Sequence, residues 1–414
     1  MTSNNQHIPL GYKPSPLGII PENWDVKRLG EACDYVDYRG KSPNKSAKGI
    51  FLVTAKNIRD GYIDYDISKE FIPTDEFEET MRRGKAQIGD VLITTEAPLG
   101  HIAQIDNPNI ALAQRVIKYR GKVGLRNTYL KYYLMSDSFQ TILVANATGS
   151  TALGIKGSRL HQLPIVIPSL IEQDSIVSVL SLWDTAIAKQ TALIEKLTLR
   201  KRGLMQQLLT GKKRLKGFEG EWHYHRIKDH FELILDKNDG KNHTPMTISA
   251  KHGLISQKNK FDRIVAGNSL DKYTLLKKGD FAYNKGNSNL YEMGCIYRLE
   301  ESSAVVPFVY ICFRTFDNTC CEFYQHFFIN HGLDKQLKKI ITSGARGDGL
   351  LNVNDKDFMM LKIPYPQIAE QRAIASILDN ADKEIEIQKQ KLSDLQEQKK
   401  GLMQVLLTGK RRII

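Results

Sequence analysis

Lysine, arginine and amide side chains gather in several loops that are rich in glycine, serine and proline. These loops read RGKSPNKSAK at 39–48, KNDGKNH at 237–243 and SQKNKFDR at 256–263. Lys and Arg contact phosphates, while Asn, Gln, Arg and Lys also pair with base edges in the major groove. A single such residue is more often simply solvated, but the loops taken together favour contact with DNA. The side chains expected to make that contact are Arg39, Lys41, Asn44, Lys45, Lys56, Thr95, Arg115, Lys241, Asn242, Lys251, Lys258, Asn284, Lys285, Asn287 and Arg346.

The sequence contains no recognisable catalytic motif. The D/N-P-P-F/Y tetrad that amino-methyltransferases place around their target base does not occur, and the nearest string is NPN at 107–109. The string TGK at 210–212 resembles the end of a phosphate-binding loop, but the preceding glycine, Gly203, lies too far upstream. Lys213 follows the string where that motif needs Ser or Thr. We therefore expect no catalytic, cofactor-binding or metal-binding residue in this chain.

Three weaker signals have a plainer interpretation as well as a functional one. His223 and His225 could hold a metal from one strand, but no third ligand has useful spacing, and a half-exposed strand edge is favoured. Glu96 and Asp348 could accept a hydrogen bond from the amino group of cytosine, although such acids are more often loop caps. The glycine-rich string at 344–349 follows a helical stretch, which favours a DNA-facing loop over a nucleotide site.

The balance of charge favours a polyanionic partner. The 414 residues carry a net charge of +13, and nucleic acid is the commonest polyanion that proteins bind. This length suggests two or three domains. The N-terminus lacks the pattern of a signal peptide, and no apolar run approaches the roughly 18 residues that span a bilayer. Five cysteines without a C-x-x-C pair fit free thiols in a reducing cytoplasm, where we expect the protein to act.

The elements that must position these loops are repeated within the chain. Residues 203–212 read GLMQQLLTGK and residues 401–410 read GLMQVLLTGK, at an offset of 198 residues. The same offset relates Trp24 to Trp222 and the pair Glu172-Gln173 to Glu370-Gln371. Most of the sequence between the matching parts has diverged. A common frame with two unlike inserts suggests two related modules that recognise different things.

Two long helices are predicted at the matching parts of the repeat. Apolar side chains recur there every 3.5 residues on average, which is the pattern of a coiled coil. We expect the two helices to pair antiparallel within one chain, with Gln190 and Gln388 fixing the register; parallel pairing between two chains is the alternative. Lys201 and Lys399 interrupt the seam at matching places. The predicted seam otherwise consists of Ile176, Leu180, Trp183, Ile187, Gln190, Ile194, Leu197, Leu204, Leu208, Ile374, Leu378, Ala381, Ile385, Gln388, Leu392, Leu395, Leu402 and Leu406.

The diverged segments predict two mixed globular domains. Each opens with a Trp and a short amphipathic stretch, continues with a strand after Gly-Asp, and closes with an apolar strand. One helix is predicted in each, over 127–143 and 319–340. The expected fold class is α+β: two mixed α/β globular recognition domains separated by two long helices that form an antiparallel coiled coil, with a pseudo-two-fold internal repeat.

These features together resemble one known family. Two variable domains, two helical spacers, an opening Trp and a repeated GLMQ-x-LLTGK ending are similar to the specificity subunit of Type I restriction–modification systems, over essentially the full length. On this basis we expect an N-terminal tail at 1–20, a target recognition domain at 21–167, a helical spacer at 168–213, a second recognition domain at 214–365 and a second spacer at 366–414.

The resemblance implies a non-catalytic subunit whose domains each read one half of a bipartite, asymmetric target in double-stranded DNA. The coiled coil would set the spacer and dock two methyltransferase subunits, which bring S-adenosylmethionine and methylate adenine. Motor and nuclease subunits, with ATP and magnesium, would complete a restriction complex. No cofactor is expected in this chain itself, and no membrane partner.

Two other classes of function stay open from the sequence alone. A coiled-coil assembly protein would use its globular heads to bind protein, and it would not bind DNA at low salt. A self-sufficient DNA enzyme would show activity as the purified chain.

Overall fold

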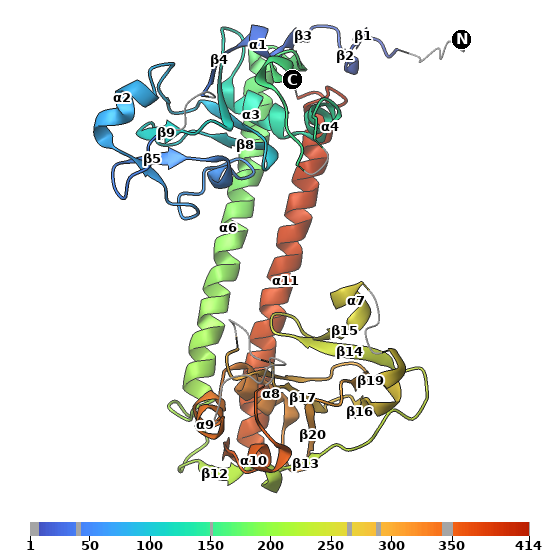
Figure 1. The fold of residues 1–414 in the computed structure, drawn as a ribbon. Coiled ribbons are helices and arrows are strands. Elements are labelled where there is room, and N and C mark those ends of the chain that lie inside the picture. Colours follow the sequence, from blue (N-terminus) through green and yellow to red (C-terminus); the bar gives the residue numbers. More distant parts are fainter. Residues whose placement is uncertain are drawn as a thin grey trace. The chain divides into compact units, whose positions relative to one another are not determined.

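The computed structural model describes residues 8–38, 43–149, 152–262, 267–286, 291–341 and 351–413. The chain divides into two compact units, which we call unit 1 (residues 1–191 and 390–414) and unit 2 (residues 192–389). Each unit combines one variable segment with parts of both long helices, α6 (Leu170–Leu208) and α11 (Ile368–Leu406) (Figure 1). The two predicted helices are therefore present, each about two residues from the predicted start.

Unit 1 contains short strands and short helices together with parts of α6 and α11. Its elements are β1 (Tyr12–Ser15), β2 (Gly18–Pro21), β3 (Asp25–Arg28), α1 (Leu29–Ala32), β4 (Cys33–Asp37), β5 (Ile50–Val53), η1 (Ala55–Asn57), β6 (Phe71–Ile72), η2 (Thr74–Glu76), α2 (Phe77–Thr80), β7 (Val91–Thr95), β8 (Leu99–Gln104), β9 (Ile110–Leu112), β10 (Val116–Gly121), α3 (Asn127–Met135), α4 (Asp137–Ala145), α5 (Gly157–Leu160) and β11 (Pro164–Ile167). The hairpin β1–β2 lies in the stretch that was expected to be a tail.

Unit 2 repeats this order after α6. Its elements are β12 (His223–Arg226), η3 (Ile227–Asp229), β13 (Phe231–Leu233), β14 (Thr244–Ser249), β15 (Gly253–Ser256), α7 (Gln257–Phe261), η4 (Gly267–Lys272), β16 (Thr274–Lys277), β17 (Phe281–Asn284), β18 (Cys295–Arg298), β19 (Ser303–Val306), β20 (Ile311–Thr315), α8 (Cys321–Ile329), α9 (Asp334–Ile340), α10 (Asp355–Met359) and β21 (Lys362–Tyr365).

The main sheets of the two units share one topology. Unit 1 has the antiparallel order β4-β10-β7-β8, and unit 2 has β13-β20-β17-β18. A two-stranded pair closes each variable segment, β3 with β11 and β12 with β21. Both units also contain a second sheet with one parallel pair, β5–β9 in the order β6-β5-β9 and β14–β19 in the order β15-β14-β19-β16. The repeat expected from the helices thus extends into domains whose sequences have diverged.

The helix predicted at 127–143 is two helices in the structure. Ser136 separates α3 from α4, and its Oγ accepts a hydrogen bond from the backbone N of Phe139 at 3.3 Å. An N-cap serine satisfies a free amide at the start of a helix, so Ser136 begins a new helix. The helix predicted at 319–340 is likewise divided into α8 and α9, with His331 at φ +60° in the turn between them. The predictions of one continuous helix over 127–143 and one over 319–340 were therefore wrong.

The seam of the long helices lies where the heptads place it. No predicted seam residue is exposed: Ile176 and Leu180 are buried in the core of unit 1, and Ile374 and Leu378 in that of unit 2. Within each unit the helical segments run antiparallel, because the start of one helix packs with the end of the other. The antiparallel pairing predicted within one chain is therefore confirmed.

Candidate nucleic-acid interface

A cluster of Trp, Glu and Arg side chains joins the first segment of unit 1 to its helices. The carboxylate of Glu172, in the first turn of α6, accepts a hydrogen bond from Nε1 of Trp24 at 3.0 Å. Nε of Arg412, which follows α11, donates to the same carboxylate at 2.8 Å. Glu172 is only 5% exposed, so its charge is balanced by Arg412 rather than by water.

Unit 2 repeats the cluster at positions displaced by 198 residues. Nε1 of Trp222 donates to Glu370 at 3.0 Å, and Nε of Arg214 donates to the other carboxylate oxygen at 2.7 Å. The Trp and Glu residues that match between the two halves of the sequence are thus hydrogen-bonded to each other in both units. The arginines were missed by sequence reasoning, although Arg214 and Arg412 stand at the same offset just after each LLTGK string.

The Gly-Asp motif of each domain forms a bidentate ion pair beneath the main sheet. Asp90, directly before β7, accepts hydrogen bonds from Nε and Nη2 of Arg120 at 2.6 and 2.8 Å. Burial acts to raise the pKa of Asp90, but the hydrogen bonds from Arg120 and the backbone N of Gln87 outweigh it and hold the pKa below its usual value. In unit 2, Nε and Nη2 of Arg314 donate to the carboxylate of Asp280 in the same way, at 3.2 and 2.9 Å.

These ion pairs fix the strands from which predicted contact residues project. Thr95 is the last residue of β7, and Asn284 is the last of β17, at equivalent places in the two main sheets. Thr95 is only 3% exposed, and both its backbone N and its Oγ1 donate to the carbonyl of Arg115, at 3.0 and 3.3 Å. Thr95 therefore positions Arg115 rather than reaching a ligand itself.

Three of the predicted cations of unit 1 border one hollow. Lys45, Lys56 and Arg115 all line a cavity of about 280 Å³. Lys45 pairs with Glu70 at 2.8 Å, and Arg115 pairs with Glu96 at 2.7 Å. The hollow is also lined by Glu70, Thr54 and Gln114 and by the apolar residues Pro43, Leu52, Ala55, Ala97 and Ala113. Basic side chains distant in the sequence are thus brought together around one hollow.

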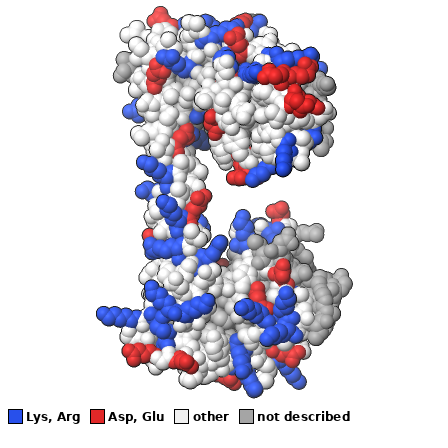
Figure 2. Space-filling model, turned by 90° about the vertical axis from the view of Figure 1, so that its left-hand side faces the viewer, with Lys and Arg blue, Asp and Glu red and all other residues white. Residues whose placement is uncertain are grey.

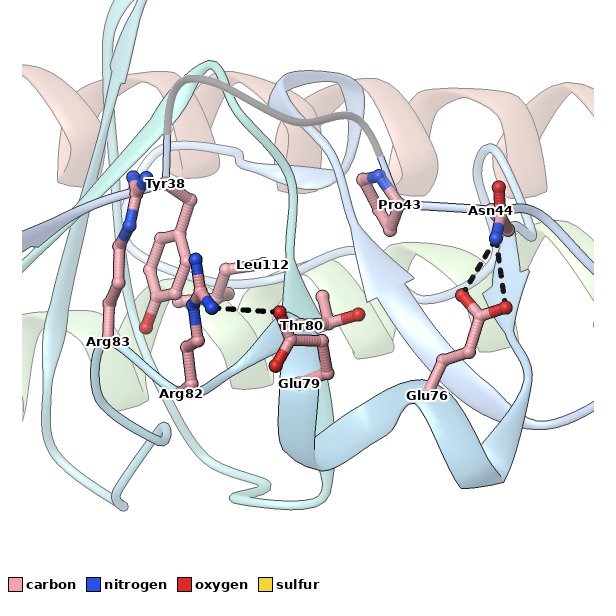
Figure 3. Close-up of a pocket in the computed structure, with 9 residues that line it drawn as sticks. All are labelled: Tyr38, Pro43, Asn44, Glu76, Glu79, Thr80, Arg82, Arg83 and Leu112. Carbon is pink, nitrogen blue, oxygen red and sulfur yellow. Dashed lines mark hydrogen bonds and ion pairs between the residues drawn. The ribbon is translucent and has the colours of Figure 1, made fainter.

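A second hollow of about 250 Å³ shares Pro43 with the first. Figure 3 shows Asn44 on one side of it, where its amide donates to the carboxylate of Glu76 at 2.9 Å. Arg82 and Arg83 lie on the other side, beside Tyr38. Sequence reasoning missed these two arginines, although the string RRGK at 82–85 is a basic run next to a glycine.

The described candidates of unit 2 are not gathered around one hollow. Lys241 and Asn242 are exposed before β14, and Lys251 is exposed in the turn after it, at the opposite end of the strand. Asp239 holds Lys241 at 3.1 Å, and hydrogen bonds from the backbone and side chain of Lys241 lower the pKa of Asp239 to about 2.

The other candidates of unit 2 lie further along the chain. Lys258 is exposed on α7. Asn284 and Lys285 are half-buried, and Nζ of Lys285 donates to the carbonyl of Val353 at 3.4 Å. The predicted residues Arg39, Lys41, Asn287 and Arg346 lie outside the described residues, as does Asp348.

Basic side chains extend beyond the predicted loops. Figure 2 shows many Lys and Arg side chains on the visible surface of unit 2, and both basic and acidic groups on that of unit 1. Dispersed cations of this kind suit contacts with several phosphates.

His225, one of the two histidines that could have held a metal, is engaged with another histidine, His230. Nδ1 of His225 lies 2.6 Å from Nε2 of His230, and both rings stack on Tyr365. Within the described ranges, no group of three His, Cys, Asp or Glu side chains is arranged to hold a metal ion. Nor does any helix in those ranges combine the length and apolar character needed to cross a membrane.

The comparisons with known proteins agree on one family. The model of the Type I restriction modification DNA specificity domain matches twice, at residues 21–199 and 220–397. The chain belongs to this family. It is 22% identical over 427 residues to the type I restriction enzyme MjaVIII specificity subunit of Methanocaldococcus jannaschii, covering 95% of this chain and 94% of the relative.

Solved structures of the family have the same fold. The S subunit of a Type-I restriction-modification system from M. genitalium matches with a TM-score of 0.54 at 16% identity, over 93% of this chain and 96% of that one. A chain from a structure on complex assembly and conformational transition of the type I R-M system matches with a TM-score of 0.58 at 17% identity, over 95% and 99%. The two family matches coincide with the two halves of the repeat.

Membership in the family settles the class of protein. The chain is a specificity subunit of a type I restriction–modification system, and it is not itself an enzyme. Its partners are DNA and the modification and restriction subunits of such a system. The Trp–Glu–Arg clusters and the paired helices are thus the frame of a specificity subunit, and the loops on the main sheets are its candidate DNA surface.

Proposed function

We propose that the two recognition domains, at 21–167 and 214–365, each read one half of a bipartite and asymmetric DNA target. The observation that carries this proposal is the duplicated frame with unlike surfaces. The clusters around Glu172 and Glu370 match residue for residue, whereas the equivalent ends of β7 and β17 in the two main sheets hold unlike side chains, Thr95 and Asn284. Equal frames with different contact residues support two different half-sites.

The long helices supply the remaining part of the proposal. A pair of 39-residue helices is stiff, so it would hold two DNA-reading surfaces at a set spacing where a flexible linker would not. Their outward faces would dock two methyltransferase subunits. Those subunits would supply S-adenosylmethionine, and motor subunits would supply ATP and magnesium chemistry. The complex would act in the cytoplasm, where the genomic DNA lies.

The test is co-expression of the chain with its modification subunit, followed by sequencing of methylated bases in the host DNA. The proposal expects one gapped, asymmetric methyladenine motif that is lost when this chain is deleted. Exchange of residues 214–365 for those of another specificity subunit should change one half of the motif and leave the other half and the gap unchanged. Absence of any gapped motif from a complex that co-purifies would contradict the proposal.

A further inference from the structure

An exposed ion pair in unit 1 has a position that stability alone does not explain. Oε1 of Glu96 lies 2.7 Å from Nε of Arg115, and the two side chains are 48% and 51% exposed. Exposed pairs of this kind contribute only about 0–1 kcal/mol to folding. Arg115 lines the same hollow as Lys45 and Lys56, and Glu96 directly precedes Ala97, which also lines it.

The backbone beneath the pair is held far more firmly than its side chains. The carbonyl of Arg115 accepts two hydrogen bonds from Thr95, through the backbone N and through Oγ1. Glu96 forms an antiparallel bridge with Gly154, and the backbone N of Ile155 donates to the carbonyl of Thr95 at 2.9 Å. Contact residues on a fixed backbone lose less entropy on binding, so this arrangement suits recognition.

The pair presents a donor beside an acceptor, which complements the major-groove edge of a G·C base pair. In the major groove, guanine shows the acceptors O6 and N7, and the cytosine paired with it shows the N4 amino donor. Arg pairs with guanine and Glu with cytosine in this geometry. An A·T pair also shows an acceptor beside a donor, at N7 and N6 of adenine, but the side chains that suit adenine are Asn and Gln, which donate and accept through one amide.

A phosphate contact fits Arg115 less well. The carboxylate of Glu96 would repel a phosphate bound at the same guanidinium, and the repulsion between two charges a few ångströms apart is substantial near a protein surface. Lys56 is better suited to a phosphate, because its ammonium acts as a compact point charge on a flexible stem. The same hollow therefore offers both kinds of contact.

We propose that Arg115 and Glu96 together read one G·C base pair in the half-site bound by unit 1, with Arg115 on guanine and Glu96 on cytosine. This inference rests on the proposed function, since it assigns residues to the recognition step of that function. Lys56 contacts the DNA backbone beside the pair and adds affinity without sequence preference.

The experiment uses the full chain in complex with its modification subunit. The methylated motif is determined for the unchanged chain and for Arg115→Ala, Glu96→Ala and Lys56→Ala, and the exchange of residues 214–365 identifies which half belongs to unit 1. Arg115→Ala and Glu96→Ala should relax the same G·C position and no other. Preference for G·C there should fall roughly 5- to 150-fold in competition binding, as for the loss of one bidentate base contact.

Lys56→Ala is the matched control at the same hollow. It should weaken binding to all sequences alike, leave the motif unchanged and lower the slope of log affinity against log salt by about one. Co-purification of each variant with the modification subunit confirms that it folds.

Two outcomes would overturn the inference while leaving the proposed function intact. One is a unit 1 half-site without any G·C pair. The other is an Arg115→Ala variant that weakens binding uniformly and keeps every position of the motif, which would make Arg115 a phosphate contact. Loss of the gapped motif from the unchanged complex would instead contradict the proposed function itself.

Discussion

At the scale of residues, one hollow of unit 1 brings together three cations that are separated in the chain. Lys45, Lys56 and Arg115 are predicted to contact DNA because basic residues in polar loops suit a polyanion, and all three line this hollow. Thr95 is predicted as a contact as well, yet it is buried against the backbone of Arg115. No sequence pattern reports which side of a strand end a short side chain will face.

Two buried histidines make unit 2 sensitive to acid. His230 and His326 are buried, and this burial lowers the pKa of both imidazoles below the usual 6.5, with His225 adding to the effect on His230 and Asp379 opposing it on His326. The folded protein thus binds fewer protons than the unfolded chain below about pH 6.5. Stability from these residues is present above that pH and is lost as the pH falls through the lowered values.

We expect acidification from pH 7.5 to 5.5 to increase hydrogen exchange in unit 2 more than in unit 1. Glutamine in place of His326 keeps a donor for Asp379 but cannot titrate, so the His326→Gln variant should show a weaker dependence on pH. Equal acid sensitivity in the variant and the original chain, measured by hydrogen-exchange mass spectrometry, would speak against this assignment.

At the scale of elements, the long helices were predictable because a five-heptad seam is a strong and local signal. The break between α3 and α4 was not, because a serine favours the start of a helix but also occurs within helices, and only the hydrogen bond from Phe139 shows that Ser136 is an N-cap. The sequence also did not predict the ion pair of Asp90 with Arg120 or its counterpart, Asp280 with Arg314. The partners are far apart in the chain, and their spacing differs between the two domains.

The lysines that interrupt the seam are explained by their partners. Nζ of Lys399 lies 2.5 Å from Asp184 within unit 1, and Nζ of Lys201 lies 2.5 Å from Asp382 within unit 2. The side chains of the lysines are only 12% and 16% exposed. Each seam therefore contains one ion pair that fixes its register, as polar residues do in coiled coils.

Reversal of one of these charges should weaken the helix pair in its own unit. Lys201→Glu places two carboxylates together, and we expect it to reduce the free energy of unfolding by about 1 kcal/mol, because Asp382 is half-exposed. The double variant Lys201→Glu with Asp382→Lys should recover most of that loss. Urea unfolding of the single and double variants measures the coupling, and two effects that simply add would argue against a specific pair.

At the scale of the whole molecule, the duplicated frame is closed by segments far apart in the chain. In unit 1, the hydroxyl of Tyr12 donates to the carbonyl of Gly409 at 2.9 Å, and Arg412 reaches Glu172. In unit 2, Arg214 follows directly from α6 to reach Glu370. The same cluster is thus made by the last segment of the chain in one unit and by an internal segment in the other.

This difference in connection predicts that matched substitutions act on different units. Arg412→Ala leaves buried Glu172 without its cation, and Arg214→Ala does the same to Glu370, so each should destabilise its own unit by about 3 kcal/mol. Hydrogen exchange should rise around Trp24 in the first variant and around Trp222 in the second. A variant in which hydrogen exchange rose only in the opposite unit, or in neither unit, would contradict this prediction. Such a result would show that the charge pair does not hold the recognition domain to its helices.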